Sequence, residues 1–488
     1  MSTKRKSLMK NYLYNLSYQL VLILSPLIVT PYITRILGPI ETGKYSFTFS
    51  IVSIFVLFAS LGFNIYGQRL IASQQSKRDQ QRKSFFEIII CKLVIFVIII
   101  IVYFIPIISK IYESKYLLLF SVETLELFNV LFDISFLFQG NEDFGVIAVR
   151  SIAVRTIGIV LIFTLVKSAE DTITYAIIQS GTVLMGSLSL WLYLPKELEK
   201  SKSKIERPFR HLPQALRLFL PTIAVSIYTL LDKTLIGVIT KSDFQVGNYE
   251  YAEKLVRILL TIVASLGIIL ISRNSALYEE ERKNELNQNV FLSFDIVVHF
   301  AFPMMFGVIV IASRFSLWFL GDEFSLAGNI MKILSPIIVL IGVSNILGQQ
   351  YLIPTRQDKK YTVAILAGSV SNIIINIPLI YYWGAFGAAA STSISELIVC
   401  IIMYLFVRKD LGDMFVLKAI KPVIAGVIML FCGLLLDYYL PSETIWVFVV
   451  TLLCVILYFS ILLIMKDSFL KKALQLIKER IIKRKSKA

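Results

Sequence analysis

Long apolar segments recur along the whole chain and limit what it can fold into. A helix needs about 20 residues to cross the hydrocarbon core of a bilayer, and apolar segments of that length occur fourteen times here. Their approximate bounds are 11–33, 45–65, 85–108, 116–138, 145–167, 172–194, 215–239, 247–271, 289–312, 326–353, 361–381, 385–407, 419–439 and 444–465. The sequence therefore predicts an all-α integral membrane protein with about 14 transmembrane helices.

The charged residues support this class and predict an orientation. Only 17% of the 488 residues are charged, against roughly 25% in an average soluble protein, which excludes a soluble enzyme. With the N-terminus placed in the cytoplasm, 33 of the 49 Lys and Arg residues fall in cytoplasmic segments and 7 in outer segments. Cytoplasmic loops of membrane proteins carry such an excess, so we expect both termini in the cytoplasm. The net charge of +16 then reflects topology, and we expect no nucleic-acid partner.

The connections between spans are too short for several kinds of domain. The longest outer segment is 313–325, and no P-loop pattern occurs, which excludes a directly ATP-driven pump. A membrane-embedded glycan polymerase or ligase would need a large outer loop, so that class stays a distant alternative. The four cysteines lie in apolar runs and the chain has two histidines, so we expect neither a metal site nor a cofactor.

Sequence similarity between two hairpins predicts two similar lobes. Ile36-Leu37-Gly38 followed by Gly43-Lys44-Tyr45 resembles Leu235-Ile236-Gly237 followed by Gly247-Asn248-Tyr249. Repeats with an even number of spans run in the same direction through the membrane. The predicted parts are an N-terminal lobe of six spans (1–194), a cytoplasmic linker (195–214), a C-terminal lobe of six spans (215–407), two further spans (408–465) and a basic tail (466–488).

The tail has an amphipathic pattern. Leu470, Leu474, Ile477 and Ile481 form an apolar stripe at helical spacing, with nine Lys or Arg residues around it. Such a segment is typical of a helix that lies on anionic lipid at the inner membrane surface. Docking of a cytoplasmic partner is the alternative.

Several motifs resemble those of a known family. They are Asn11, Asn15, Gln19, Pro26, the run from Pro31 to Pro39 (PYITRILGP), Gly43-Lys44-Tyr45, Leu61-Gly62, Phe138-Gln139-Gly140 with Phe144, and Asp232-Lys233 before Ile236-Gly237. The chain resembles the bacterial polysaccharide-repeat flippases, of the O-antigen and capsule type, within the multidrug/oligosaccharidyl-lipid/polysaccharide exporter superfamily. The resemblance implies two six-helix lobes around a central cavity, in a multi-pass protein of the bacterial cytoplasmic membrane. It also implies a transporter, not an enzyme, which flips undecaprenyl-diphosphate-linked oligosaccharide from the inner to the outer leaflet by alternating access. Polysaccharide-assembly proteins are the partners to expect.

Basic residues at membrane depth are candidates for contact with such an anionic cargo. Charge inside a membrane is costly and usually faces a water-filled cavity. The candidates for a cationic cavity are Arg257, Lys233, Lys254, Arg155 and Arg35. The span 247–271 carries Glu250, Glu253, Lys254 and Arg257 on one helical face, with each acid four residues before a base. Pairing that only holds helices together is the alternative.

Two further sets of polar residues lie within the predicted spans. Asn11, Asn15 and Gln19 form a stripe suited to sugar hydroxyls or to bonding a neighbouring helix. The acids Asp133, Glu396, Asp232 and Glu253 are candidates for ion coupling, since an intramembrane carboxylate can exchange a proton or bind sodium. Lys92 and Lys332 have no evident partner in the sequence.

Two other transport functions stay open. A peptidoglycan lipid-precursor flippase has the same number of spans and a basic cavity, and a multidrug or cation antiporter of the same superfamily usually has twelve spans and an acidic cavity. The basic hairpin favours a flippase, with surface polysaccharide biosynthesis as the process it serves.

Overall fold

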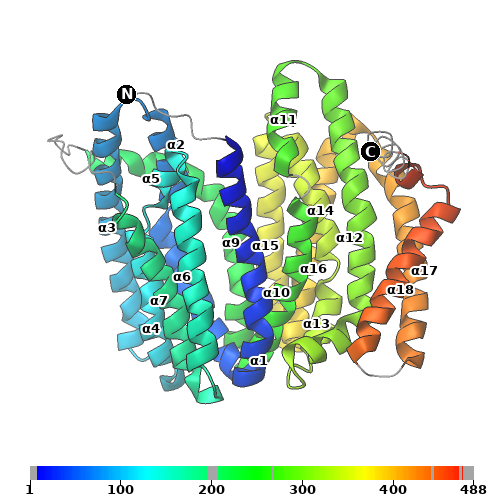
Figure 1. The fold of residues 1–488 in the computed structure, drawn as a ribbon, viewed down its shortest axis with the longest axis horizontal. Helices are drawn as coiled ribbons and strands as arrows, with labels where there is room; N and C mark the ends of the chain where they lie inside the picture. Colours follow the sequence, from blue (N-terminus) through cyan, green and yellow to red (C-terminus); the bar gives the residue numbers. More distant parts are fainter. Residues whose placement is uncertain (1–7, 195–206, 266–267, 441–443, 472–474, 476–488) are drawn as a thin grey trace, which may run out of the picture. The chain divides into compact units, whose positions relative to one another are not determined.

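The computed structural model describes residues 8–194, 207–265, 268–440, 444–471 and 475. These residues form helices joined by short connections, and they contain no strand, as the sequence predicts. The chain divides into two compact units, Met1–Gly247 and Asn248–Ala488. Within each unit the helices run side by side (Figure 1).

The first unit is built from eight α-helices in its described residues. They are α1 (Leu8–Ser60), α2 (Phe63–Ser73), α3 (Arg78–Ile108), α4 (Ser114–Phe132), α5 (Ser135–Gly140), α6 (Phe144–Leu165), α7 (Thr172–Trp191) and α9 (Leu212–Thr240). The short 3₁₀ segments η1 (Ala169–Asp171) and η2 (Pro208–His211) precede α7 and α9. The long α1 contains the first predicted span and most of the second, and its backbone breaks between them at Gly38, where φ is 66° and ψ is 177°. Glycine adopts this left-handed φ without a steric penalty.

Two buried clusters hold the first unit together. Phe63, Phe85, Phe136 and Ala215 join α2, α3, α5 and α9. The other cluster packs the middle of α1 against α6 and α7. Because α9 contacts α1 and α2, it belongs to the first unit, although it contains the seventh predicted span. The lobe boundary between residues 194 and 215 stays a prediction.

The second unit begins inside α10 (Asp243–Ser265). Its other helices are α11 (Ile268–Glu279), α12 (Lys283–Leu320), α13 (Ala327–Leu334), α14 (Ile337–Asn345), the π-helix η3 (Ile346–Leu352), α15 (Asp358–Trp383), α16 (Ala385–Leu411), α17 (Met414–Tyr439) and α18 (Thr444–Ile464). The last two predicted spans, α17 and α18, pack against each other and against α12.

Polar contacts fix both ends of this three-helix group. Arg314 of α12 pairs with Asp437 of α17 at 2.8 Å. Near the middle of α12, where α18 ends, His299 Nε2 lies 3.1 Å from Asp467 Oδ1. The same carboxylate accepts hydrogen bonds from the backbone N–H groups of Phe469 and Leu470. The start of the predicted tail is therefore anchored to α12, while most of its amphipathic stripe lies outside the described residues.

Each of the fourteen predicted spans coincides with one helix or with two or three consecutive helices. Among the described residues, ten helical stretches are long and apolar enough to cross a membrane. The helix α10 is not one of them, since it carries the charged face. The exact number of fourteen crossings stays a prediction.

Candidate functional site

The charged face of α10 is the first candidate, and its central pair forms as the spacing predicts. Arg257 Nε donates to Glu253 Oε1 at 2.7 Å. The Glu253 side chain is 4% exposed and that of Arg257 is 34% exposed, so the acid is buried and the guanidinium group reaches the surface of the unit. The ammonium group of Lys254 lies 5.2 Å from the ring centroid of Tyr251. This face therefore holds a paired acid and two bases within one turn of helix.

Contacts from the first turns of α10 fix this face within the second unit. Asn248 Oδ1 accepts hydrogen bonds from the backbone N–H groups of Leu326 at 3.1 Å and Ala327 at 3.0 Å. An amide in this position satisfies donors that the first turn of α13 leaves without helical partners. The phenol of Tyr249 lies 3.4 Å from the hydroxyl of Thr392 on α16. The charged face is thus held by α13 and α16.

A buried polar seam lies between α15 and α16. Asn376 Nδ2 donates to Asn372 Oδ1 at 3.3 Å, and the hydroxyl of Ser391 donates to the carbonyl oxygen of Asn372 at 3.3 Å. Glu396 and Ser395 are also buried on α16. Within the described residues, Asn372 Nδ2 and the Ser395 hydroxyl have no hydrogen-bond partner. Buried polar groups normally have partners, so these two groups are exceptions within the seam.

Sequence reasoning found only part of the seam. Glu396 was an ion-coupling candidate, and Asn372 and Asn376 stand at i, i+4 spacing in the sequence. The hydroxyl residues of α16 were missed. Their signal is a run of Ser and Thr residues from 391 to 395 inside an apolar span, which close helix packing explains equally well.

In the first unit the structure gives Lys92 a partner. Lys92 is 2% exposed, and its Nζ donates to the backbone oxygen of Asp133 at 2.6 Å. The Asp133 carboxylate accepts hydrogen bonds from Asn64 Nδ2 at 2.8 Å and from the N–H of Ser135 at 2.9 Å. Asp133 therefore shapes the break between α4 and α5, and its predicted role in ion coupling stays a prediction.

The other predicted site residues lie on several helices. In the first unit, Arg35 is exposed on α1, Arg155 is half-buried on α6, and α9 carries a half-buried Lys233 beside a fully buried Asp232. Asn11, Asn15 and Gln19 fall on α1, but their side chains lie outside the described part of the chain. Among the described residues, no group of three or more His, Cys, Asp or Glu side chains could hold a metal ion.

The two hairpins of similar sequence come into close backbone contact at Gly43 and Gly247. A Cβ added to Gly43 would lie 1.8 Å from the backbone oxygen of Asp243, and one added to Gly247 would lie 2.1 Å from that of Pro39. No real Cβ comes so near, so both positions require glycine. The similar motifs thus lie where α1 and the start of α10 are in direct contact.

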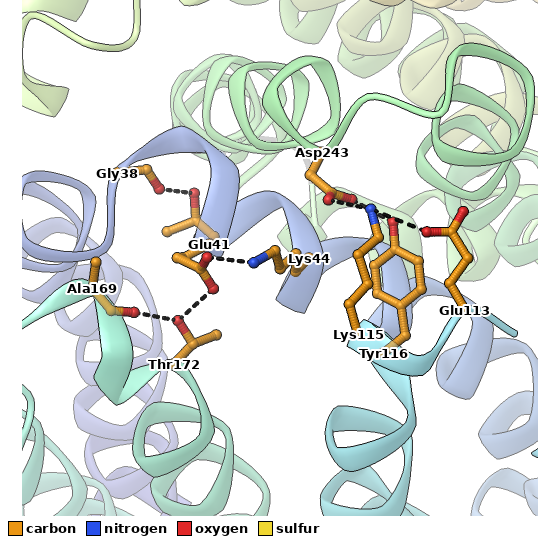
Figure 2. A network of polar contacts seen from close by, with 10 residues as sticks. Gly38, Glu41, Lys44, Glu113, Lys115, Tyr116, Ala169, Thr172 and Asp243 are labelled. Atoms are coloured by element: carbon orange, nitrogen blue, oxygen red, sulfur yellow. Dashed lines mark hydrogen bonds and ion pairs between the residues drawn. The ribbon is translucent and has the colours of Figure 1, made fainter.

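Ion pairs surround this crossing (Figure 2). Asp243 accepts from Lys115 Nζ at 2.9 Å and from the Tyr116 hydroxyl at 2.6 Å. On α1, Glu41 pairs with Lys44 at 2.5 Å and accepts from the Thr172 hydroxyl at 3.1 Å. Burial opposes the charge of Lys115, but the hydrogen bonds of Tyr116 and Asp243 raise its pKa above the usual value. Sequence reasoning missed this network, because Lys115 and Asp243 are 128 positions apart.

Comparison with known proteins identifies the family. The family model described as "Polysaccharide biosynthesis protein" matches residues 8–271, more than half of the chain. The chain belongs to this family. It is also 26% identical over 391 residues to the "Putative O-antigen transporter" of Shigella dysenteriae, which covers 78% of this chain and 95% of that protein.

Solved structures share the fold of this family member. The lipid II flippase MurJ, in an inward closed conformation, matches with a TM-score of 0.64 at 18% identity, covering 90% of this chain and 99% of that one. An inward-facing multidrug resistance MATE family transporter of the MOP superfamily matches with a TM-score of 0.62 at 12% identity, covering 80% of this chain and 94% of that one. The resemblance inferred from the sequence motifs is confirmed, and the protein is a multi-pass membrane protein with this transporter fold.

Proposed function

We propose that this polysaccharide biosynthesis family member flips undecaprenyl-diphosphate-linked oligosaccharide repeat units across the bacterial cytoplasmic membrane. The observation that carries the proposal is the likeness to an O-antigen transporter, which extends over 78% of this chain and 95% of that protein. The proposed direction is from the inner to the outer leaflet, with both termini in the cytoplasm. The repeat units then supply surface polysaccharide assembly.

The chemistry of the cargo fits the charges on α10 and α9. A diphosphate and its sugars cannot enter hydrocarbon, whereas a polyprenyl tail stays in lipid. Arg257 is the strongest candidate for phosphate contact, because its guanidinium group is partly exposed and already oriented by Glu253. Lys254, Lys233, Arg155 and Arg35 remain proposed contributors to a cationic cavity, and Asn11, Asn15 and Gln19 remain proposed sugar contacts. Asp232, Glu253, Asp133 and Glu396 remain proposed ion-coupling acids.

Complementation tests this proposal. In a strain whose own repeat-unit flippase is deleted, the wild-type gene supplied with its cognate polysaccharide genes should restore surface polysaccharide. We expect Arg257→Ala and Lys233→Ala to reduce surface polysaccharide at least about tenfold, the effect of losing roughly 1.4 kcal/mol of interaction, while membrane levels stay normal. Lys421→Ala is the control with the same charge change, since Lys421 binds the backbone oxygen of Met465. Normal polysaccharide in both test variants would overturn the cationic-cavity proposal.

A peptidoglycan-precursor flippase is the second candidate, favoured by 21% identity over 202 residues to the "Lipid II flippase MurJ" of Bacillus subtilis. Rescue of cells depleted of their lipid II flippase distinguishes the two. We expect no rescue by the wild-type chain at expression levels that restore surface polysaccharide. The match to the multidrug transporter, at 12% identity, concerns the fold alone.

A further inference from the structure

A proline follows the tenth predicted span and alters the helix before it. The π-helix η3 (Ile346–Leu352) ends two residues before Pro354. A proline has no N–H, and its ring clashes with the carbonyl group four residues before it, which here belongs to Gln350. The N–H of Ile353 bonds to the oxygen of Gly348, five residues back, at 3.0 Å. The wider π-helix therefore accommodates the proline ring.

The same proline leaves one backbone carbonyl group without a donor from its own segment. Residue 354 has no N–H to offer, and the N–H of Thr355 bonds to the oxygen of Tyr351 at 3.0 Å. The oxygen of Gln350 is reached from another helix, since Asn274 Nδ2 of α11 donates to it at 2.9 Å. Asn274 is 0% exposed and Gln350 is 3% exposed. A buried carbonyl group needs such a partner, so Asn274 replaces the bond that Pro354 removes.

A second amide holds the first in place. Asn289 Nδ2 of α12 donates to Asn274 Oδ1 at 3.2 Å, and α11 packs against both α12 and η3. The turn between α11 and α12 lies at one end of the second unit (Figure 1). Beside it, Glu279 pairs with Arg356 at 2.6 Å, but both side chains are more than half exposed. An exposed pair contributes little, so the buried amides form the stronger polar link between α11 and η3.

The closed contact is opposed by an unsatisfied group. The side-chain oxygen of Gln350, Oε1, is buried and has no hydrogen-bond partner among the described residues. Burial of such an atom destabilises the closed arrangement by an amount comparable to the gain from one hydrogen bond. An opening that let water reach Gln350 would satisfy its backbone and side-chain oxygens together. The opposing effects bring the closed and open arrangements closer in free energy.

We propose that the contact from Asn289 through Asn274 to the Gln350 carbonyl group is a latch that holds α11 on η3. In this proposal η3 is the hinge at which that end of the second unit opens. Prolines and π-helical turns are the usual sites of bending in helices. Asn274 satisfies the carbonyl group when the latch is closed, and water does so when it is open. The movement belongs to the chain alone, so the proposal goes beyond the proposed function and applies to any cargo.

Amide hydrogen exchange of the purified full-length chain in lipid nanodiscs, read by mass spectrometry, tests the latch. Peptides from α11 and η3 report its opening, because a helix of 12 residues is marginal without packing partners and its amides then exchange. Asn274→Leu removes the donor at nearly constant volume. It should speed exchange in both peptides at least about tenfold, which is roughly 1.4 kcal/mol, and leave α17 and α18 unchanged. Asn289→Ala should speed it about threefold, which is roughly 0.7 kcal/mol.

A variant that restores the missing donor distinguishes a latch from simple packing. Pro354→Ala supplies an N–H that the Gln350 oxygen can accept, so Asn274 becomes dispensable. The double variant Asn274→Leu/Pro354→Ala should therefore exchange within about threefold of Pro354→Ala alone. Ser275→Ala is the control on α11, because the Ser275 hydroxyl bonds to the oxygen of Ile271 in its own helix. It should exchange like the wild type.

Three results would overturn the latch. The first is unchanged exchange of α11 and η3 in Asn274→Leu. The second is faster exchange that Pro354→Ala does not reduce, and the third is a rise that extends equally to α17 and α18. If Asn274→Leu does not fold, Asn289→Ala with and without Pro354→Ala makes the same comparison with a smaller effect. The measurement needs no cargo, so failure here is distinguishable from failure of the proposed function.

Discussion

The helices α4 and α10 carry acids at the same spacing but compensate them differently. In α10, Glu250 and Glu253 each precede a base by four residues, and the Glu253–Arg257 pair closes at 2.7 Å. In α4, Glu123 and Glu126 have no such base, and they face hydroxyl groups from α1 and α7. A helix that supplies its own counter-charge presents its remaining bases to an anion.

The difference separates a partly exposed charged face on α10 from a buried acidic pair on α4. The exposed side of the α10 pair is suited to a phosphate-bearing cargo, which requires a cation that stays charged. The α4 pair is buried among neighbouring helices, and Glu123 accepts a hydrogen bond from the Thr48 hydroxyl of α1. Four substitutions test this comparison, and their expected effects on stability decrease from Gly43→Ala to His211→Gln.

Gly43→Ala should give the largest loss of stability, because it forces α10 away from α1. The new Cβ would overlap the backbone oxygen of Asp243, and overpacking of this kind costs about 3 kcal/mol. Thermal unfolding in nanodiscs measures the change. Gly181→Ala is the matched control on α7, with no atom within 4 Å of the added Cβ, and it should be neutral or slightly stabilising. Equal effects of the two substitutions would argue against a direct crossing.

Arg257→Met should break the compensation within α10. The substitution removes the donor to a carboxylate that is 4% exposed. We expect a loss of about 2 kcal/mol, below the value for fully buried pairs because Arg257 reaches the surface. The double variant Glu253→Gln/Arg257→Met should recover most of this loss in the same unfolding assay. A strictly additive double variant would show that the pair is not coupled.

Asp243→Asn should weaken the attachment of α10 to α4 only modestly. The amide oxygen can still accept from Tyr116, but the ion pair with the partly exposed Lys115 is lost. We expect a loss of about 1 kcal/mol. The difference from the wild type should shrink in high salt, which screens exposed charges. A loss that does not depend on salt would point to a role other than ion pairing.

His211→Gln should have the smallest effect and should change with pH. His211 lies between Tyr66 at 2.7 Å and Glu87 at 2.9 Å. Burial lowers the pKa of His211, and the hydrogen bond to Glu87 only partly opposes this. The neutral imidazole is therefore favoured by folding, so its contribution is complete above the unfolded pKa of about 6.5 and declines as the pH falls through the lower, folded pKa.

Unfolding of His211→Gln and wild type, compared between pH 8 and pH 5, checks this sign. The stability advantage of the wild type should decrease on acidification, and an advantage that grows would contradict the pKa direction. Glu87 is a third case for the comparison of the acids on α4 and α10. It is a buried acid whose base, Arg210, comes from another segment and lies 2.8 Å away, whereas the acids of α4 have no base beside them among the described residues.

Local patterns in the sequence were enough to predict much of the fold. Apolar length predicted the helices, and the i, i+4 spacing predicted the Glu253–Arg257 pair, because both depend on a single helix. Two contacts could not be predicted, because they join distant segments. Lys92 and Asp133 are 41 positions apart, and Lys115 and Asp243 are 128 positions apart. The similarity of the motifs around Gly43 and Gly247 could be seen in the sequence, but only the packing shows that the two glycines lie in contact.

The same limit applies to the candidate sites. The spacing of Glu123 and Glu126 was readable, yet the sequence did not single them out among the intramembrane acids. The hydrogen bond from Thr48 to Glu123 joins α1 to α4 across 75 positions, which no local pattern encodes. The assignment of α9 to the first unit likewise depends on its contacts with α1 and α2, which no local pattern encodes.

Direct measurement of lipid flipping tests the central claim. Purified protein is reconstituted into liposomes with a polyprenyl-diphosphate oligosaccharide that carries a fluorescent sugar label, and a membrane-impermeant reductant reports the fraction in the outer leaflet. We predict that the wild type exposes the inner-leaflet label within the assay and that Arg257→Ala slows this at least about tenfold. Protection of the inner-leaflet label equal to that in protein-free liposomes would contradict the account.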